Sequence, residues 1–145
     1  MTTTEPRTAT SNTVGATHPL NRLSAEEMAA AVTAIRAHAD FGPRMRFVSV
    51  GLHEPDKAEV LAHNAGDPIE RHCDAILLDN ADGSAHEVVV SVTKRAVVSW
   101  QRRTDVQPSV MADEFLEAEA AIRLDPGFVA AMARRGLTDM SLICV

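Results

Sequence analysis

The stretch HEVVVSVTKRAVVSW, residues 86–100, decides the fold of this chain. On each side of Lys94-Arg95, apolar side chains recur at every second position, which is typical of strands with one buried face. The pattern predicts that Val88, Val90 and Val92 share one face before the turn, and that Ala96, Val98 and Trp100 alternate with Val97, Ser99 and Gln101 after it. The stretch therefore predicts a β-hairpin that carries almost no reactive side chains.

The turn of this hairpin has unusual residues. A two-residue type I′ turn needs positive φ at both positions, which Asn-Gly tolerates and Lys94-Arg95 resists. Either the turn is of another type, or each residue is strained by about 1 kcal/mol or more. The sequence leaves both alternatives open.

A helix is predicted to begin after Ser24. Ser24 is a good N-cap, Glu27 three residues later completes a capping box, and Leu23 can act as a hydrophobic staple. Apolar residues then recur at helical spacing, which predicts a buried stripe. Its members are Met28, Val32, Ile35 and Ala39.

Two more strands are expected between this helix and the hairpin, over residues 44–52 and 70–79. Residues 53–68 contain two prolines and a glycine and are predicted to form a long loop, while residues 80–84 are predicted to form a turn. Strands joined mostly by short turns favour an antiparallel meander. The predicted fold class is therefore α+β, with one helix packed on a four-stranded antiparallel meander, a cystatin-like small domain.

The two ends of the chain differ from this domain. Residues 1–17 are Thr-rich and are predicted to be a disordered tail, so the small domain is assigned to residues 18–105. Residues 106–145 predict two helices, the second with Asp125 as N-cap and Pro126 at its first position, and then a strand at SLICV. We interpret 106–145 as the incomplete start of a second, similar domain.

Composition excludes several classes of protein. The net charge of −6 argues against nucleic-acid binding, which needs a basic face. Two cysteines without a C-x-x-C pair favour a reducing compartment, and neither a signal peptide nor a membrane-length apolar run is present. A soluble, cytoplasmic protein without a membrane partner is expected.

The polar residues predict no catalytic, cofactor-binding or metal-binding residues. The six histidines include no H-x-H or H-E-x-x-H motif, although a metal site from His53, His63 and His72 stays an alternative if the 53–68 loop folds back. Cys73 lies mid-strand on an apolar face, which disfavours a thiolate nucleophile. Nucleotide-binding and serine-hydrolase motifs are missing from the sequence.

Three phrases in this order resemble one family. They are HPLNRLSAEEMAAAVTAIRA (18–37), HEVVVSVTKRAVVSW (86–100) and PSVMADEFLEAEAAIRLDPGFVAAMARRGLTDMSLICV (108–145). Together they are similar to the N-terminal region of copper-containing primary amine oxidases. That resemblance implies two small α+β domains followed by a large catalytic β-sandwich that this chain lacks.

The resemblance also implies a reaction. Relatives oxidise a primary amine with O₂ to an aldehyde, ammonia and hydrogen peroxide, using copper and a topaquinone made from a tyrosine. The chain has no tyrosine and no H-x-H, and Asp56, Asp74 and Asp79 lie in no matching motif, so none of these roles is transferred.

We therefore expect a catalytically silent N-terminal part whose partners are the remainder of the oxidase and, as in the family, a second copy in a homodimer. The alternative is a stand-alone α+β module that binds a peptide at a sheet edge. A third hypothesis is the small histidine metal-binder.

Overall fold

A computed structural model describes residues 16–144 of the chain. These residues form two compact units, one ending at Asp105 and one starting at Val106. The predicted tail of residues 1–17 lies outside the described residues except for Ala16 and Thr17. Thr17 donates its backbone N–H to Asn21 Oδ1 at 3.1 Å.

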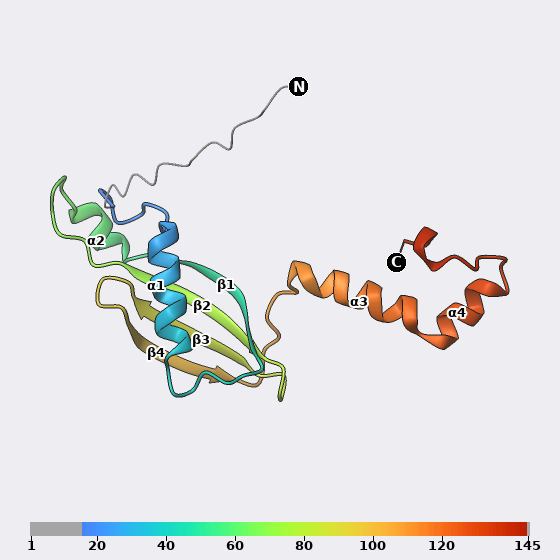
Figure 1. The fold of residues 1–145 in the computed structure, drawn as a ribbon. Coiled ribbons are helices and arrows are strands. Elements are labelled where there is room, and N and C mark those ends of the chain that lie inside the picture. Colours follow the sequence, from blue (N-terminus) through green and yellow to red (C-terminus); the bar gives the residue numbers. More distant parts are fainter. Residues whose placement is uncertain (1–15, 145) are drawn as a thin grey trace, which may run out of the picture. The chain divides into compact units, whose positions relative to one another are not determined.

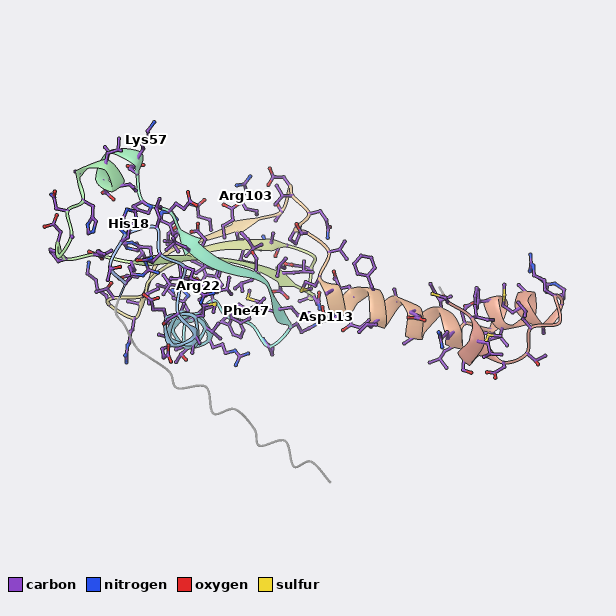
Figure 2. The ribbon with its side chains drawn as sticks, turned by 90° about the horizontal axis from the view of Figure 1, so that it is seen from above. His18, Arg22, Phe47, Lys57, Arg103 and Asp113 are labelled. Carbon is purple, nitrogen blue, oxygen red and sulfur yellow. The ribbon has the colours of Figure 1, made fainter. Side chains whose placement is uncertain are left out.

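The first unit contains a single antiparallel sheet with strand order β1-β2-β3-β4 (Figure 1). The strands are β1 (Met45–His53), β2 (His72–Asp79), β3 (Ala85–Ser91) and β4 (Ala96–Arg103). Each strand pairs with its sequence neighbour, so the predicted α+β meander is confirmed. Helix α1 (Ala25–Arg36) lies on one face of this sheet; Figure 2 looks down its axis and shows it next to the labelled Phe47.

The N-terminus of α1 has the predicted capping box. Ser24 Oγ accepts the backbone N–H of Glu27 at 3.1 Å, and Glu27 Oε2 accepts that of Ser24 at 2.7 Å. The predicted buried stripe is confirmed at Ile35, but Met28 is 38% exposed, and Ala31 is the second buried residue of the helix. Glu27 is half-buried on the sheet-facing side, where it meets a buried arginine described below.

The core lies between α1 and the sheet. Burying one aliphatic side chain such as Ile35 stabilises the fold by about 1.5–3 kcal/mol. The buried cluster consists of Leu23, Ala31, Ile35, Cys73, Ala75, Leu77, Val88, Val90 and Val92. It thus contains Val88, Val90 and Val92, which are predicted to share one face of the first hairpin strand.

The β3–β4 hairpin has a wider turn than a two-residue loop. Ser91 pairs with Ala96, so four residues connect the strands, and Lys94 donates its backbone N–H to Ser91 Oγ at 3.0 Å. Only Arg95 has positive φ (54°) among the described non-glycine residues. The turn is therefore of another type, and the strain falls on one residue rather than two.

The second strand of this hairpin departs from strict alternation. Val90 pairs with Val97 while Val89 pairs with Ser99, so Val98 is an extra residue in a bulge and is 60% exposed. Val97 and Trp100 both pack against the core, so the bulge interrupts the predicted alternation of Ala96, Val98 and Trp100 with Val97 and Ser99.

The predicted 53–68 loop contains a short helix, α2 (Lys57–Ala62), which the sequence analysis missed. Its six residues lie between Pro55 and Gly66, and none of them is buried. Without a buried face there is no helical apolar period to detect.

The second unit, taken by itself, contains α3 (Ala112–Leu124), α4 (Pro126–Ala133) and a 3₁₀ turn, η1 (Met140–Leu142). Asp125 caps α4 as predicted, since its Oδ1 accepts the backbone N–H of Phe128 at 2.7 Å. The strand predicted at SLICV is wrong. Asp139 Oδ1 accepts the backbone N–H of Ser141 at 2.9 Å and begins η1 in its place.

Candidate functional site

The structure brings together two of the three histidines in the metal-site hypothesis. His53 and His72 are direct cross-strand partners on β1 and β2, with ring centroids 6.1 Å apart. His63 instead has its ring 5.6 Å from that of His18 and its Nε2 3.3 Å from the carbonyl oxygen of Thr17. Within residues 16–144, no group of three or more His, Cys, Asp or Glu side chains is placed to hold a metal ion.

The two cysteines have opposite environments. Cys73 is fully buried in β2, and this burial raises the pKa of its thiol. Cys144 is exposed, and both thiols are free. A raised thiol pKa in an apolar core opposes the thiolate needed for nucleophilic chemistry, so Cys73 acts as a small core residue.

The three aspartates weighed as a base do not converge. Asp74 Oδ1 lies 2.7 Å from His53 Nδ1, Asp79 Oδ1 accepts the backbone N–H of Ala81 at 2.8 Å, and Asp56 precedes α2 at its N-cap position. Asp74 and Asp79 are therefore engaged in separate contacts, and the Asp56 side chain makes no cap hydrogen bond to α2.

A polar chain runs from the β2–β3 turn to β4, buried at Ser84 and His86 and exposed at Asp82 and Arg102, and the sequence analysis did not detect it. Trp100 Nε1 donates to His86 Nδ1 at 2.9 Å, His86 Nε2 lies 3.2 Å from Ser84 Oγ, and Ser84 Oγ donates to Asp82 Oδ1 at 2.7 Å. Arg102 Nη2 completes the chain at 2.6 Å from Asp82 Oδ2. The alternation of the opening stretch offered a signal, because it places His86 on the same face as the buried valines.

The Ser84–His86 contact is not a nucleophile and its base. Because the indole N–H of Trp100 occupies His86 Nδ1, the neutral ring carries its proton on Nε2, which faces Ser84. A base must present a lone pair to the hydroxyl that it deprotonates, and His86 presents a proton instead. This chain of hydrogen bonds fixes the β2–β3 turn and the Trp100 indole.

A second buried polar cluster joins the start of α1 to the sheet. Arg71 is only 6% exposed, and its Nε donates to Glu27 Oε1 at 2.6 Å. The same guanidinium donates to the carbonyl oxygens of Pro19 (3.3 Å), Asn21 (2.7 Å) and Arg22 (3.1 Å). The Arg71 side chain thus binds both the segment before α1 and Glu27 of the capping box, which is a structural role.

A groove of about 850 Å³ lies beside this cluster, between the start of α1 and β1. Its lining includes residues 21–25, Glu27, Met28 and residues 50–52. Glu27 is already paired with Arg71, so the groove does not present a free acid and base to a substrate.

The fold and its polar clusters define a small α+β scaffold domain, whose buried polar groups are used for architecture. The AGAO-like N2 domain model matches residues 24–100, more than half of the chain. The chain therefore belongs to the AGAO-like N2 domain family.

Relatives with known names agree with this assignment. A primary amine oxidase from Arthrobacter sp. (strain P1) is 41% identical over 132 residues, covering 90% of this chain and 20% of the relative. A primary amine oxidase from Klebsiella aerogenes is 35% identical over 125 residues, covering 84% of this chain and 16% of the relative. The chain thus spans about one fifth or less of the length of these relatives and is similar to the N-terminal domain region of copper amine oxidases.

A solved structure shares the fold. The copper-containing benzylamine oxidase from Hansenula polymorpha superposes with a TM-score of 0.66 at 19% identity, covering 80% of this chain and 19% of that chain. At this identity the likeness concerns the fold alone.

The residues of this chain do not fit a copper–quinone centre. The sequence has no tyrosine from which a quinone could be made, and no three histidines gather among residues 16–144. No step of amine oxidation is therefore assigned to these residues. No helix in that described part of the chain is both long and apolar enough to cross a membrane.

Proposed function

We propose that this chain is the non-catalytic N-terminal part of a copper amine oxidase. The whole enzyme would oxidise a primary amine with O₂ to an aldehyde, ammonia and hydrogen peroxide, using copper and topaquinone held elsewhere. The observation that carries the proposal is the family match over residues 24–100 together with 41% identity to a primary amine oxidase across 90% of the chain. The use of the buried polar groups as structural ties supports a scaffold role.

The partners of this scaffold follow from the same proposal. Its main partner would be the rest of the oxidase chain, and the complete enzyme would be a homodimer. Residues 106–145 would begin a second small domain. The exposed apolar side chains on α3 support this proposal, because the rest of that domain would cover them. Phe115 is 67%, Leu116 68% and Leu124 82% exposed.

The proposed location is the cytoplasm. Both cysteines are free, and Cys144 is exposed, which suits a reducing compartment. This location stays a prediction, to be checked by fractionating cells that express the protein.

A peroxide assay tests the catalytic part of the proposal. The purified chain is incubated with Cu²⁺, O₂ and methylamine, and the primary amine oxidase of Arthrobacter sp. (strain P1) serves as positive control. We expect peroxide from the control and none above background from the chain. Sustained turnover by the chain would show that it is not a silent scaffold.

A second experiment tests the assignment to an oxidase. The coding region on both sides of these residues is sequenced and translated. A reading frame that continues into N-Y-D/E and H-x-H motifs supports the proposal, and a stop directly after Val145 in the natural gene overturns it in favour of an independent module.

A further inference from the structure

The cross-strand pair His53 and His72 places two imidazole rings close together on β1 and β2. We propose that these two imidazoles chelate one divalent first-row transition ion, with Cu²⁺ bound most tightly. The order of metals follows from imidazole ligands, whose affinity rises towards Cu²⁺ and falls again at Zn²⁺. This inference is independent of the proposed oxidase function, because it concerns only residues of this chain.

The backbone places the two rings on one face of the sheet. His53 and His72 are direct partners in the antiparallel β1–β2 ladder, so their side chains project to the same side. Their ring centroids are 6.1 Å apart with planes at 73°. Metal–nitrogen bonds of about 2.0–2.1 Å would put two imidazole centroids of one site roughly 5–6 Å apart, so small side-chain rotations suffice.

A carboxylate already orients one ring for this role. His53 Nδ1 lies 2.7 Å from Asp74 Oδ1, so the Nδ1–H faces the carboxylate and Nε2 keeps its lone pair. Metal-binding histidines almost always use their second nitrogen in this way, and the contact fixes the tautomer and the direction of the ligand.

A carboxylate lies near the second ring. Glu70 Oε1 is 3.6 Å from His72 Nε2 and 2.7 Å from Lys94 Nζ. Glu70 is therefore an ion-paired neighbour of the two imidazoles and is not counted among the ligands.

The surroundings also favour a cation. The two rings border a recess of about 350 Å³ whose other lining residues include Glu54, Asp56, Glu59 and Glu70. Glu70 is paired with Lys94, and the other three carboxylates give the recess a negative potential that concentrates divalent cations. Since the protein supplies two imidazoles rather than three or four fixed ligands, water completes the coordination, and we expect weaker binding than in a structural zinc site.

The chain provides a matched control. His18 and His63 also lie close, with ring centroids 5.6 Å apart, but their recorded ring contacts are with main-chain groups. His63 Nε2 lies 3.3 Å from the Thr17 carbonyl oxygen, and His18 Nδ1 accepts the backbone N–H of Leu20 at 3.1 Å. Proximity alone would make both pairs bind equally, whereas our proposal favours the carboxylate-oriented pair.

The test is a calorimetric Cu²⁺ titration of the full chain and four variants at neutral pH. We expect one equivalent of Cu²⁺ in the wild type and a loss of affinity of about tenfold or more in His53→Gln and in His72→Gln. Asp74→Asn should weaken binding by about tenfold, because only the orientation of His53 is lost. His63→Gln should leave the affinity unchanged.

A spectroscopic readout confirms the ligands, and circular dichroism confirms the fold. The His53 and His72 side chains are 45% and 29% exposed, so their replacement leaves the core intact. Titration with diamagnetic Zn²⁺ should shift the ring resonances of His53 and His72 before those of the other histidines. The proposal is overturned by non-saturable Cu²⁺ binding, by binding that survives His53→Gln and His72→Gln, or by an equal loss in His63→Gln.

Discussion

Replacing Arg71 by methionine is expected to destabilise the first unit by about 3 kcal/mol. Methionine keeps most of the length and the aliphatic character of the side chain but removes the guanidinium. The change therefore isolates the hydrogen bonds of Arg71 from its packing.

The magnitude follows from the contacts that disappear. The charged bond from Arg71 to Glu27 (2.6 Å) contributes about 1.5–3 kcal/mol, and each bond to a carbonyl oxygen contributes about 0.5–1.5 kcal/mol. Glu27 keeps 24% of its side chain exposed and its bond to the Ser24 amide, which lowers its desolvation cost. Burial of the methionine side chain offsets part of the lost stabilisation, which leaves a net decrease of about 3 kcal/mol in the free energy of unfolding.

Urea unfolding followed by the fluorescence of Trp100 measures this loss. Trp100 is the single tryptophan of the chain and lies against the core of the first unit, so its signal reports that unit. Arg22→Met is the matched control, because it makes the same chemical change at an exposed position of the neighbouring segment. We expect the control to shift stability by less than about 0.5 kcal/mol.

A double-mutant cycle with Glu27→Gln separates the energy of the Arg71–Glu27 ion pair from that of the other hydrogen bonds of Arg71. Glutamine preserves the capping box but removes the charge. In Arg71→Met the Glu27 carboxylate has lost its buried partner, so adding Glu27→Gln should cost little more, and the coupling should reach at least about 1 kcal/mol. Two results would refute the conclusion that the Arg71 contacts stabilise the fold. One is a loss of unfolding free energy below about 0.5 kcal/mol in Arg71→Met, and the other is strictly additive effects of the two substitutions.

Three further outcomes follow from the same structure. In the folded chain an alkylating thiol reagent should modify Cys144 rapidly and Cys73 only after unfolding, because burial raises the pKa of the Cys73 thiol; rapid modification of both would contradict its burial. The Ser84 hydroxyl and amide, together with the Arg102 guanidinium, hold the pKa of Asp82 well below its usual 3.8. The contribution of the Asp82 carboxylate to stability is therefore fully present above pH 3.8 and is lost as the pH falls through the lower folded-state pKa. Asp82→Asn should therefore lower the urea midpoint more at neutral pH than at about pH 2, and an equal deficit at both pH values would argue against this linkage. Backbone amides should exchange hydrogen more slowly over residues 20–103 than over 110–145, since the buried core lies in the first range; equal rates in both would contradict the expectation.

The parts of the fold that the sequence predicted are those set by local patterns. Ser24 and Glu27 lie three residues apart, so their capping box needs no information from elsewhere in the chain. The alternation at residues 70–79 and 86–92 likewise reflects one buried face of a sheet. Such signals are local, and the structure confirms them.

The features that the sequence did not reveal depend on distant partners. Glu27 faces the sheet because Arg71, 44 positions later, neutralises it, whereas a carboxylate taken alone is assigned to the solvent side. This pair shifts the inward face of α1 away from Met28. Similarly, the Val98 bulge is defined only by its register with β3, and alternation alone therefore placed Val98 on the same face as Trp100.

The same limit applies to the candidate site. The sequence named His53, His63 and His72 as a set, but only the β1–β2 register determines which two are partners. Asp74, which orients His53, was considered only as a base because its diagonal position across the strands is not visible in the linear order. The oxidase resemblance, by contrast, rested on long phrases of sequence, and the family match confirmed it.

The meander order β1-β2-β3-β4 has a consequence for how the protein is made. During synthesis each new strand leaves the ribosome next to one that is already present, so the sheet can grow by one hairpin at a time. Helix α1 is made first, but the buried positions of Ala31 and Ile35 exist only after β2 and β3 have formed. Arg71 directly precedes β2, so the side chain that binds Glu27 of α1 becomes available just before the strand that forms much of the core.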